Sequence, residues 1–370
     1  MGIKIIPYSE NMIESVIDFN QRLAECGATD SFPESNIPTW LPKVADRKIY
    51  QECFLAVENN SIVRGGYILK HQDFFLKGST YSFGVPQIPI SEGLINNSYN
   101  IVAIQLLTDA LKKKELLYGL GIGSYNAPIY HIHKALGFSS ITVPFFFKVN
   151  KPFQFFRKIS YLRNSFVYRL MLDFLAFTGI GILLINVFQY LVKKKHINKE
   201  SISIELIQDF GEWSDKLWEE CKNEFSIIAI RDSKTLNILY SKNKFIRMRI
   251  SLGNQIIGWV VVLDTQMNNH KQFGNMRVGS IIDCLAKPDN ESIVVACATD
   301  YLERRGVDIL ISNQSNHRWC SALKESGFIN GPSNFIFTAS KKLTELIKPI
   351  DTTIPNSHFN RGDADGPINL

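Results

Sequence analysis

Short apolar runs alternate along the chain with longer segments in which apolar residues recur every three or four positions. The first pattern is typical of buried strands, and the second predicts amphipathic helices. Each half of the chain begins and ends with a short run: Ile3 to Pro7 and Ile141 to Val149 in the first, Ile202 to Ile207 and Phe335 to Ala339 in the second. Helical stretches, a hairpin and a central strand lie between these runs in the same order. The pattern therefore predicts two α/β units, each a mixed sheet with helices on both faces.

The two halves also repeat one another in sequence. SYNAPIYHIHKALGF and QSNHRWCSALKESGF each carry an Asn, Asn126 or Asn316, followed twelve residues later by the Phe of a Gly-Phe pair. Upstream, TDALKKKELLYGLGI matches TDYLERRGVDILISN, and NSIVRGGYILK matches NQIIGWVVVLD. Because three blocks match in the same order at nearly constant spacing, we interpret the halves as an internal repeat.

The order of these blocks, with the Asn and the Gly-Phe pair late in each half, resembles the GNAT N-acetyltransferase superfamily over most of both halves. RDSKTLNILY and the closing RGDADGPINL are similar to segments of the tandem GNAT proteins linked to bacterial surface-polysaccharide genes. The resemblance implies an α/β fold of two tandem GNAT-like mixed sheets with flanking helices, joined by an apolar helical segment. The expected divisions are a first domain at 1–149, a connecting segment at 150–197, a second domain at 198–345 and a C-terminal tail at 346–370.

The resemblance implies acyl-CoA, such as acetyl-CoA, as the donor. In GNAT enzymes a Q/RxxGxG/A loop after the central strand presents backbone N–H groups to the pyrophosphate at a helix N-terminus. The first half has only Gly93 in this region, beside Glu92, and the second half has no glycine but carries Asp289 and Glu291. Carboxylates repel a pyrophosphate, so these departures weigh against acyl-CoA, most strongly in the second half.

Two residues are candidates for catalysis. His133 stands where many GNAT enzymes have a Tyr that protonates the leaving thiolate, and an imidazole with a pKa of about 6.5 can transfer a proton. The second half has Leu323 there, which favours the first half as the active one. Asp283, inside the apolar run VGSIIDCLA, would be a buried base. A surface or part-buried helix histidine and an Asp paired with a nearby Arg are the alternatives.

Other candidates are assigned to binding. Asn126, Tyr130 and Asn316 are predicted to contact the cofactor, and the two Asn residues are also expected to cap the helices that follow them. Arg231 and Asp232 follow the apolar IIAI run and would bind an anionic substrate. The alternative is that Asp232 caps the next helix.

Charge and cysteine content limit the classes of ligand and the cellular compartment that we expect. The net charge of +6 suits a phosphate, an acidic ligand or an anionic membrane, but is too small for a dedicated nucleic-acid binder. The six cysteines form no zinc-like cluster and the N-terminal residues no signal peptide, which predicts a reduced, metal-free cytoplasmic protein. The tail has no apolar periodic face, so disorder is expected, with its Arg-Gly-Asp triplet a coincidence.

Residues 174–192 carry no charged side chain and have basic residues before and after them in the sequence. A single membrane crossing would put the matched halves on opposite sides, and basic flanks at both ends oppose it. Gly179 and Gly181 permit a bend. We expect a bent helix pair on the inner membrane face, and the alternative is a helix pair packed between the domains.

These observations favour an N-acyltransferase acting on an amino sugar or a lipid-linked sugar intermediate in surface-polysaccharide biosynthesis. One alternative is a Fem-like aminoacyl or peptidyl transferase that takes a charged tRNA, although no sustained heptads predict the coiled-coil arm of that family. Another is a non-catalytic module that binds a glycan or a partner, which the degenerate loops of both halves favour.

Overall fold

The computed structural model describes residues 2–45, 47–192 and 201–364. The chain forms two compact units, and each unit combines two separate segments. Unit 1 comprises Met1–Ile141 and Ile336–Asp351, and unit 2 comprises Thr142–Phe335 and Thr352–Leu370.

Unit 1 contains an antiparallel sheet in the order β1-β2-β3-β4 and a second, small sheet in the order β5-β15-β6. The strand predicted at Ile3 to Pro7 is present with those bounds. The strands and helices of the unit are β1 (Ile3–Pro7), η1 (Glu10–Met12), α1 (Ile13–Glu25), β2 (Tyr50–Glu58), β3 (Ile62–Leu76), β4 (Ser79–Ser91), η2 (Glu92–Leu94), η3 (Asn97–Tyr99), α2 (Asn100–Lys113), β5 (Tyr118–Leu120), α3 (Pro128–Ala135), β6 (Ser139–Thr142), β15 (Ile336–Ala339) and α11 (Lys341–Ile347).

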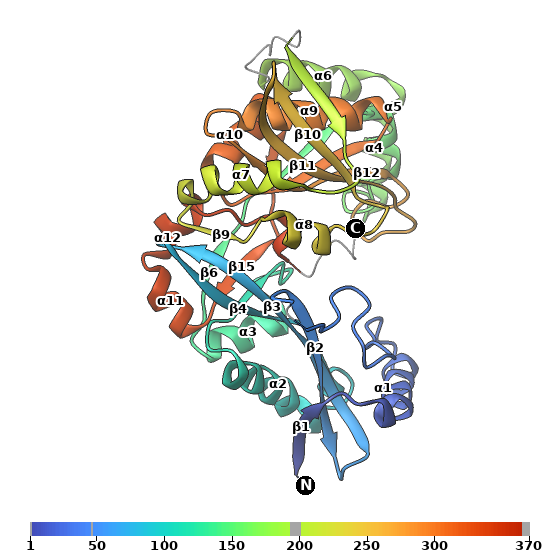
Figure 1. Cartoon of the computed structure of the whole chain (residues 1–370). Coiled ribbons are helices and arrows are strands. Elements are labelled where there is room, and N and C mark those ends of the chain that lie inside the picture. Colours follow the sequence, from blue (N-terminus) through green and yellow to red (C-terminus); the bar gives the residue numbers. More distant parts are fainter. Residues whose placement is uncertain (1, 46, 193–200, 365–370) are drawn as a thin grey trace. The chain divides into compact units, whose positions relative to one another are not determined.

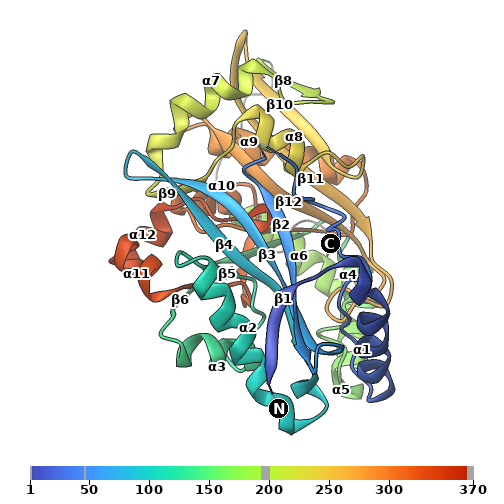
Figure 2. The ribbon, with the colours of Figure 1, turned by 60° about the horizontal axis from the view of Figure 1, so that its bottom comes forward.

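Helices cover both faces of the larger unit 1 sheet. On one face α1 packs through Val16 and Phe19 against Leu55 of β2. On the other face α2 packs through Leu106 against Phe54. Side chains of adjacent strand residues point to opposite faces, so neighbouring positions of β2 serve the two cores. Figure 2 shows α1 and α2 on the two sides of the sheet.

Unit 2 contains one sheet of seven strands in the order β14-β7-β13-β12-β11-β10-β8. Within it only β12 and β13 pair in parallel. Its strands and helices are β7 (Phe145–Val149), α4 (Pro152–Lys158), α5 (Phe166–Phe177), α6 (Ile180–Val192), β8 (Ile202–Leu206), α7 (Glu212–Cys221), η4 (Lys222–Glu224), β9 (Ile227–Ala229), α8 (Ser233–Leu239), β10 (Ile246–Leu252), β11 (Gln255–Gln266), β12 (Arg277–Ala286), α9 (Glu291–Arg304), β13 (Ile309–Asn313), α10 (His317–Glu325), β14 (Ile329–Gly331), η5 (Ile354–Asn356) and η6 (Arg361–Asp363), with α12 (Ile350–Thr353) spanning the boundary with unit 1.

Each unit takes in a strand that follows the other unit in sequence. β7 comes after the first half, but in the unit 2 sheet Phe147 pairs with Ile311 of β13 and with Ile329 of β14. β15 comes after the second half, but Thr338 pairs with Gly119 of β5 in unit 1. The strand predicted at Ile141 to Val149 is thus divided into β6 and β7, and the strand predicted at Phe335 to Ala339 is present as β15. β7 and β15 each join the sheet of the other unit.

The connecting segment is helical and belongs to unit 2. α4, α5 and α6 pack on β7, β12 and β13 through a shared apolar core that includes Phe156, Leu172 and Ile309, while α9 lies along the sheet (Figure 1). No single helix in the described ranges is long and apolar enough to cross a bilayer. By length and composition, α5 and α6 pass such a test only as a pair, and that pair bends by 76° beside Gly179, as the glycines predicted.

The expectation of a disordered tail was wrong for residues up to Ala364. α11, α12, η5 and η6 lie in this region, and His358, Asn360 and Asp363 are fully buried. The backbone of the segment finds partners, since His358 N donates to Ile227 O at 2.8 Å. Hydrogen bonds and ion pairs of its polar side chains hold this segment inside unit 2. A search of the sequence for apolar periodicity does not detect a segment that is held in this way. The last six residues lie outside the described ranges.

Candidate functional site

The parallel strands β12 and β13 separate partway along their length. They pair from Val278 and Ile309 to Ile281 and Ser312, and no register pair joins them beyond that point. We call the space after this last pair the unit 2 fork. Ligands of open α/β sheets bind outside the carboxyl ends of parallel strands, so a fork of this kind is a natural site.

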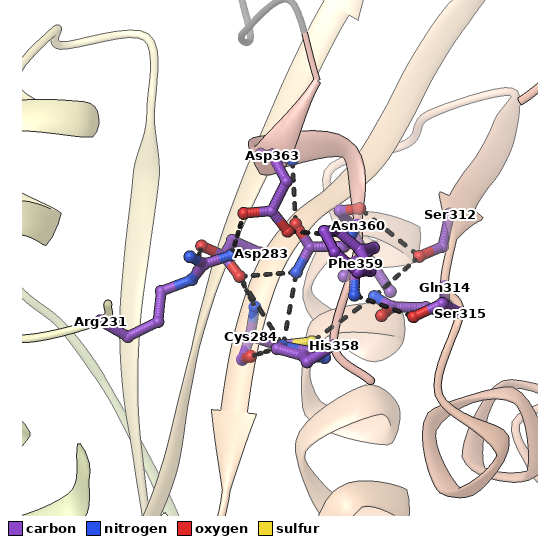
Figure 3. A network of polar contacts seen from close by, with 12 residues as sticks. Arg231, Asp283, Cys284, Ser312, Gln314, Ser315, His358, Phe359, Asn360 and Asp363 are labelled. Atoms are coloured by element: carbon purple, nitrogen blue, oxygen red, sulfur yellow. Dashed lines mark hydrogen bonds and ion pairs between the residues drawn. The ribbon is translucent and has the colours of Figure 1, made fainter. Parts of the chain in front are cut away.

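The C-terminal segment, residues 352–364, fills the unit 2 fork (Figure 3). On the β12 side, the Asn360 amide donates to Asp283 Oδ1 at 2.6 Å and His358 Nε2 lies 2.7 Å from Cys284 O. On the β13 side, Asn360 forms a bridge with Gln314. The segment thus bonds to both strands where they no longer bond to each other.

Arg231 stands between two carboxylates at the centre of this network. Its Nε lies 2.7 Å from Asp283 Oδ2, and its second amino group donates to Asp363 Oδ1 at 2.6 Å. All three side chains are fully buried. Burial alone would lower the pKa of Arg231, but the charges of Asp283 and Asp363 raise it above the ordinary value, so the guanidinium stays charged.

Asp283 receives further donors. The Tyr240 hydroxyl donates to Oδ2 at 2.7 Å, and the backbone N–H of Cys284 donates to Oδ1 at 2.9 Å. Burial and the charge of Asp283 raise the pKa of Tyr240, so this hydroxyl keeps its proton. Donors therefore surround both oxygens of the carboxylate. This arrangement confirms the ion-pair alternative for Asp283; its role as a base stays a prediction.

Each residue of the Arg-Gly-Asp triplet has its own structural role. Arg361 donates to Asn313 Oδ1 at 2.8 Å, and Asp363 binds Arg231. Gly362 passes so close to Tyr240 that a Cβ atom would lie 2.3 Å from the hydroxyl oxygen. A capping box between Asn360 and Asp363 fixes the turn.

His358 is held in one neutral form. Burial lowers the pKa of His358, so the imidazole is neutral. Because a carbonyl oxygen can only accept, Nε2 carries the ring proton and donates a hydrogen bond to Cys284 O. Within the described chain, Nδ1 has no hydrogen-bond partner. The ring stacks on Phe225 at 5.0 Å. The imidazole anchors the C-terminal segment to β12.

The helix that follows β12 does not suit a pyrophosphate. Glu291 is the first residue of α9 and is buried, with Oε1 3.5 Å from Arg318 Nε. Burial raises the pKa of Glu291, and hydrogen bonds from the backbone at Glu291 and Asp289 act in the opposite direction. The carboxylate thus takes up donors at the helix N-terminus that an anion would need. The residues of unit 2 do not fit acyl-CoA.

Unit 1 has a corresponding fork. β4 and β5 meet in parallel only at Gly84 and Leu117, and no register pair in the described part of unit 1 joins β4 to another strand on this side beyond Gly84. The register between β3 and β4 shifts here, leaving Ile88 unpaired at a φ of 47°. A β-branched residue at positive φ is strained, which is common at functional sites.

The helix that follows β4 lacks the unpaired acidic group that the sequence predicted there. α2 begins at Asn100 without a side-chain cap, after the short turn η3, which Asn96 caps and into which the N–H of Asn100 donates. Glu92, expected to repel a pyrophosphate, is bound by Arg22 at 2.9 Å and by Arg64 at 2.6 Å, and Arg64 also binds Glu58 at 2.8 Å. Gly93 lies against this helix start, where a Cβ atom would come 3.0 Å from Tyr99 O. Unit 1 therefore lacks the obstacle to a pyrophosphate that Glu291 forms at the start of α9.

His133 lies inside unit 1, with 3% of its surface exposed. Its Nδ1 lies 2.9 Å from Thr338 Oγ1, and the ring stacks on Phe138 at 4.5 Å. Burial lowers the pKa of His133 to about 4, so the imidazole is neutral at neutral pH. The alternative of a surface or part-buried histidine was therefore wrong, because the side chain is buried; the catalytic role stays a prediction.

The predicted helix caps have different outcomes. Asn316 caps α10 and accepts from Arg318 N at 3.0 Å, as expected. Asn126 does not cap α3, because Pro128 begins the helix and makes Ala127 the cap residue. Tyr130 lies on α3, with its hydroxyl 3.3 Å from Ser140 Oγ.

Arg231 and Asp232, adjacent in sequence, serve different structures. Asp232 caps α8 and accepts from Thr235 N at 2.7 Å, while Arg231 binds Asp283. Sequence reasoning missed the partners Asp363 and His358. The spacing of Asn360 and Asp363, which matches a capping box, was the one signal that indicated local structure there. In the described residues no group of three or more His, Cys, Asp or Glu side chains could hold a metal ion.

No protein-family model matches the sequence, and a comparison with curated proteins finds no match. Solved structures do match. A GCN5-related N-acetyltransferase from Anabaena variabilis is 9% identical over 91% of this chain and 72% of its own, with a TM-score of 0.52. A probable N-acyltransferase from Enterococcus faecalis is 10% identical over 94% of this chain and 74% of its own, with a TM-score of 0.53. Saccharomyces cerevisiae N-myristoyltransferase, solved with bound myristoyl-CoA, is 12% identical over 91% and 78%, with a TM-score of 0.50. The predicted tandem GNAT-like α/β fold is confirmed.

Proposed function

We propose that unit 1 is an N-acyltransferase that uses acyl-CoA as donor and the amine of a free or lipid-linked amino sugar as acceptor. The observation that carries this proposal is the contrast between the two forks. The C-terminal segment occupies the unit 2 fork, whereas in the described part of unit 1 the edge of β4 that faces away from β3 has no register pair beyond Gly84.

The start of α2 is the proposed pyrophosphate site. No side chain caps α2, which follows the strand of the fork after the two short turns η2 and η3. A helix N-terminus attracts anions through its first N–H groups and through its dipole. The ion pairs of Glu92 with Arg22 and Arg64 support the proposal, because they compensate the one carboxylate of η2.

The strained turn of β4 is the proposed oxyanion site. Ile88 and Pro89 have no register partner on β3, and Pro89 has no N–H, so Ile88 is the backbone donor that we assign to this site. In the transfer, the amine nitrogen attacks the thioester carbon, the carbon–sulfur bond breaks, and the amine loses a proton while the thiolate gains one. A backbone donor that faces the carbonyl oxygen stabilises the negative charge of the transition state.

α3 contributes the remaining candidates. We assign proton donation to Tyr130, which is half buried with its hydroxyl 3.3 Å from Ser140 Oγ, and support of the helix to His133. We assign the exposed Asn126, which lies just before this helix, to cofactor binding. Unit 2 is then a structural partner, with Arg231, Asp283 and Asn316 assigned to holding its fork and α10.

The acceptor is tested by measuring free thiol released from acetyl-CoA with a panel of amines. Hexosamines and nucleotide-linked amino sugars are compared with lysine and spermidine. We expect thiol release above the hydrolysis background with a sugar amine only, and a Tyr130→Phe variant should reduce it while an exposed control, His131→Gln, should not. Release with the non-sugar amines alone would reject the sugar acceptor, and acetyl-CoA binding without turnover on any amine would favour a non-catalytic module.

A further inference from the structure

We infer that α5 and α6 form a docking surface for an anionic phospholipid bilayer, with a basic hollow beside them that receives a lipid phosphate. The inference concerns unit 2 alone and stands apart from the proposed acyl transfer. It rests on an apolar surface, on the hollow, and on the contacts that join the two.

The outer face of the helix pair is apolar and exposed. Phe166 and Tyr190 have 73% and 76% of their surfaces exposed. The other large exposed apolar side chains of the pair are Val167, Tyr168, Leu170, Met171, Phe174, Phe177, Ile180, Leu183, Leu184, Val187, Phe188 and Leu191. Soluble surfaces rarely expose so continuous an apolar area, and such areas mark contact with a partner or a membrane.

This face is separate from the side of the helices that holds them to unit 2. Leu172 and Ala176 of α5 are buried and face the sheet core, and Ile185 of α6 packs against the same core. One side of each helix therefore packs against the core of unit 2, and the other side is exposed. A bend of 76° keeps the pair from forming one long rod. Helices that present one apolar face in this way lie in the interfacial plane of a bilayer.

The hollow beside α5 is basic and polar. It has a volume of about 520 Å³ and is lined by Arg157, Lys158, Ser160, Arg163, Asn164, Arg169, Asn269, Gly274 and Asn275. Asp173 binds two of these groups, at 2.8 Å from Arg157 and 2.6 Å from Arg163. Lys158 lies 3.4 Å from Asp308. Four cationic side chains thus line the hollow, with side-chain amides and a hydroxyl to complete the ligation of an anion.

The hollow and the apolar face are continuous. Arg157 lines the hollow, and its guanidinium lies over the ring of Phe177, 5.1 Å from the centroid. Phe177 also packs against the exposed Phe153 of α4, with ring centroids 5.7 Å apart. Arg169 of α5 lines the hollow from the helix that carries much of the apolar face.

A basic hollow directly beside an exposed apolar face matches the chemistry of a phospholipid. A phospholipid has a phosphate at one end and acyl chains directly beside it. Its headgroup fits the basic hollow while its chains meet the exposed face of α5 and α6. A bilayer with anionic lipids adds attraction for each basic side chain near its surface.

The test is flotation of the full-length chain with two kinds of vesicle: phosphatidylcholine alone, and phosphatidylcholine with about 30% phosphatidylglycerol. The wild type should float with the anionic vesicles. Leu183→Ser, Leu184→Ser, Val187→Ser and Phe188→Ser combined should lower binding to them at least about tenfold while the circular dichroism spectrum stays unchanged.

A second variant tests the hollow. Arg157→Gln with Arg169→Gln should lower binding to anionic vesicles by about fivefold or more, whereas the matched control Arg304→Gln with Lys324→Gln, which removes two exposed basic groups of α9 and α10, should change it less than about twofold. Equal loss in both double variants would reject the hollow as the lipid site.

Other occupants give results that contradict the inference. A wild type that floats with neither vesicle refutes the docking surface. Stabilisation by inorganic phosphate without flotation would make the hollow a site for a soluble anion. A dimer in light scattering that the serine variant dissolves, without flotation, would assign the apolar face to a second copy of the chain. Unfolding of the serine variant would assign that face to the protein core.

Discussion

Arg231→Met is the sharpest test of the lock formed by the C-terminal segment. Met is close to Arg in length but carries no charge, so the change removes only the cation that joins Asp283 to Asp363. Both carboxylates are fully buried and lose the opposite charge that Arg231 holds at hydrogen-bond distance. Breaking a buried ion pair by removing one partner costs about 3 to 5 kcal/mol, because the other charge stays desolvated.

Guanidinium unfolding measures the stability, and amide hydrogen exchange measures whether residues 352–364 are released before the rest of unit 2. The matched control is Arg304→Met, which removes an exposed Arg that pairs with Asp300 at 2.9 Å on α9. An exposed pair of this kind contributes about 0.5 kcal/mol or less. A loss below about 1 kcal/mol for Arg231→Met, with protection of the segment unchanged, would refute the lock.

Three further changes have defined outcomes. Gly362→Ala should cost about 1 to 3 kcal/mol in thermal unfolding, because its Cβ would lie 2.3 Å from the Tyr240 hydroxyl oxygen; a cost below about 0.5 kcal/mol would show that the turn relaxes freely. Burial lowers the pKa of His133 to about 4, against about 6.5 in the unfolded chain, so the unfolded chain binds more protons between these two pH values. About 3 kcal/mol of folding stability is therefore lost as pH falls from about 6.5 to about 4. Thermal melts of His133→Gln should lack this part of the dependence of stability on pH, and an unchanged dependence would refute the burial of His133. Asn316→Ala should cost about 1 kcal/mol as a lost cap, whereas Asn126→Ala, its counterpart in the repeat, should cost less than about 0.5 kcal/mol; equal costs would contradict the assignment of the caps.

Much of the fold could be predicted because its signals are local or repeated. The strand at Ile3 to Pro7, the cap at Asp232 and the bend beside Gly179 each follow from a few neighbouring residues. The matched blocks of the two halves indicated a tandem α/β protein. The exchange of β7 and β15 was not predictable in this way, since the pattern of a strand shows which face is buried and does not name its partner.

The centre of unit 2 could be predicted only in part, for a similar reason. Asp283 and Arg231 were recognised separately, and an ion pair was one of the alternatives, but Asp363 lies 132 residues after Arg231. Its segment is buried by hydrogen bonds and charge, which leave no periodic apolar pattern. For His133 the sequence suggested a catalytic role, whereas the structure shows a buried imidazole. Its partner Thr338 lies 205 residues away in the sequence, so local sequence could not indicate this contact.

The central claim, that unit 1 alone binds acyl-CoA, is tested most directly by calorimetric titration with acetyl-CoA of the wild type and of two matched variants. Asn100→Asp places a carboxylate in the first turn of α2, where it stabilises the helix but repels a pyrophosphate, and Asn290→Asp places one at the N-cap position of α9. We predict one acetyl-CoA per chain, bound at least about tenfold more weakly by Asn100→Asp and within about twofold of wild type by Asn290→Asp. Two sites per chain, or weakening by Asn290→Asp with Asn100→Asp unaffected, would contradict the account.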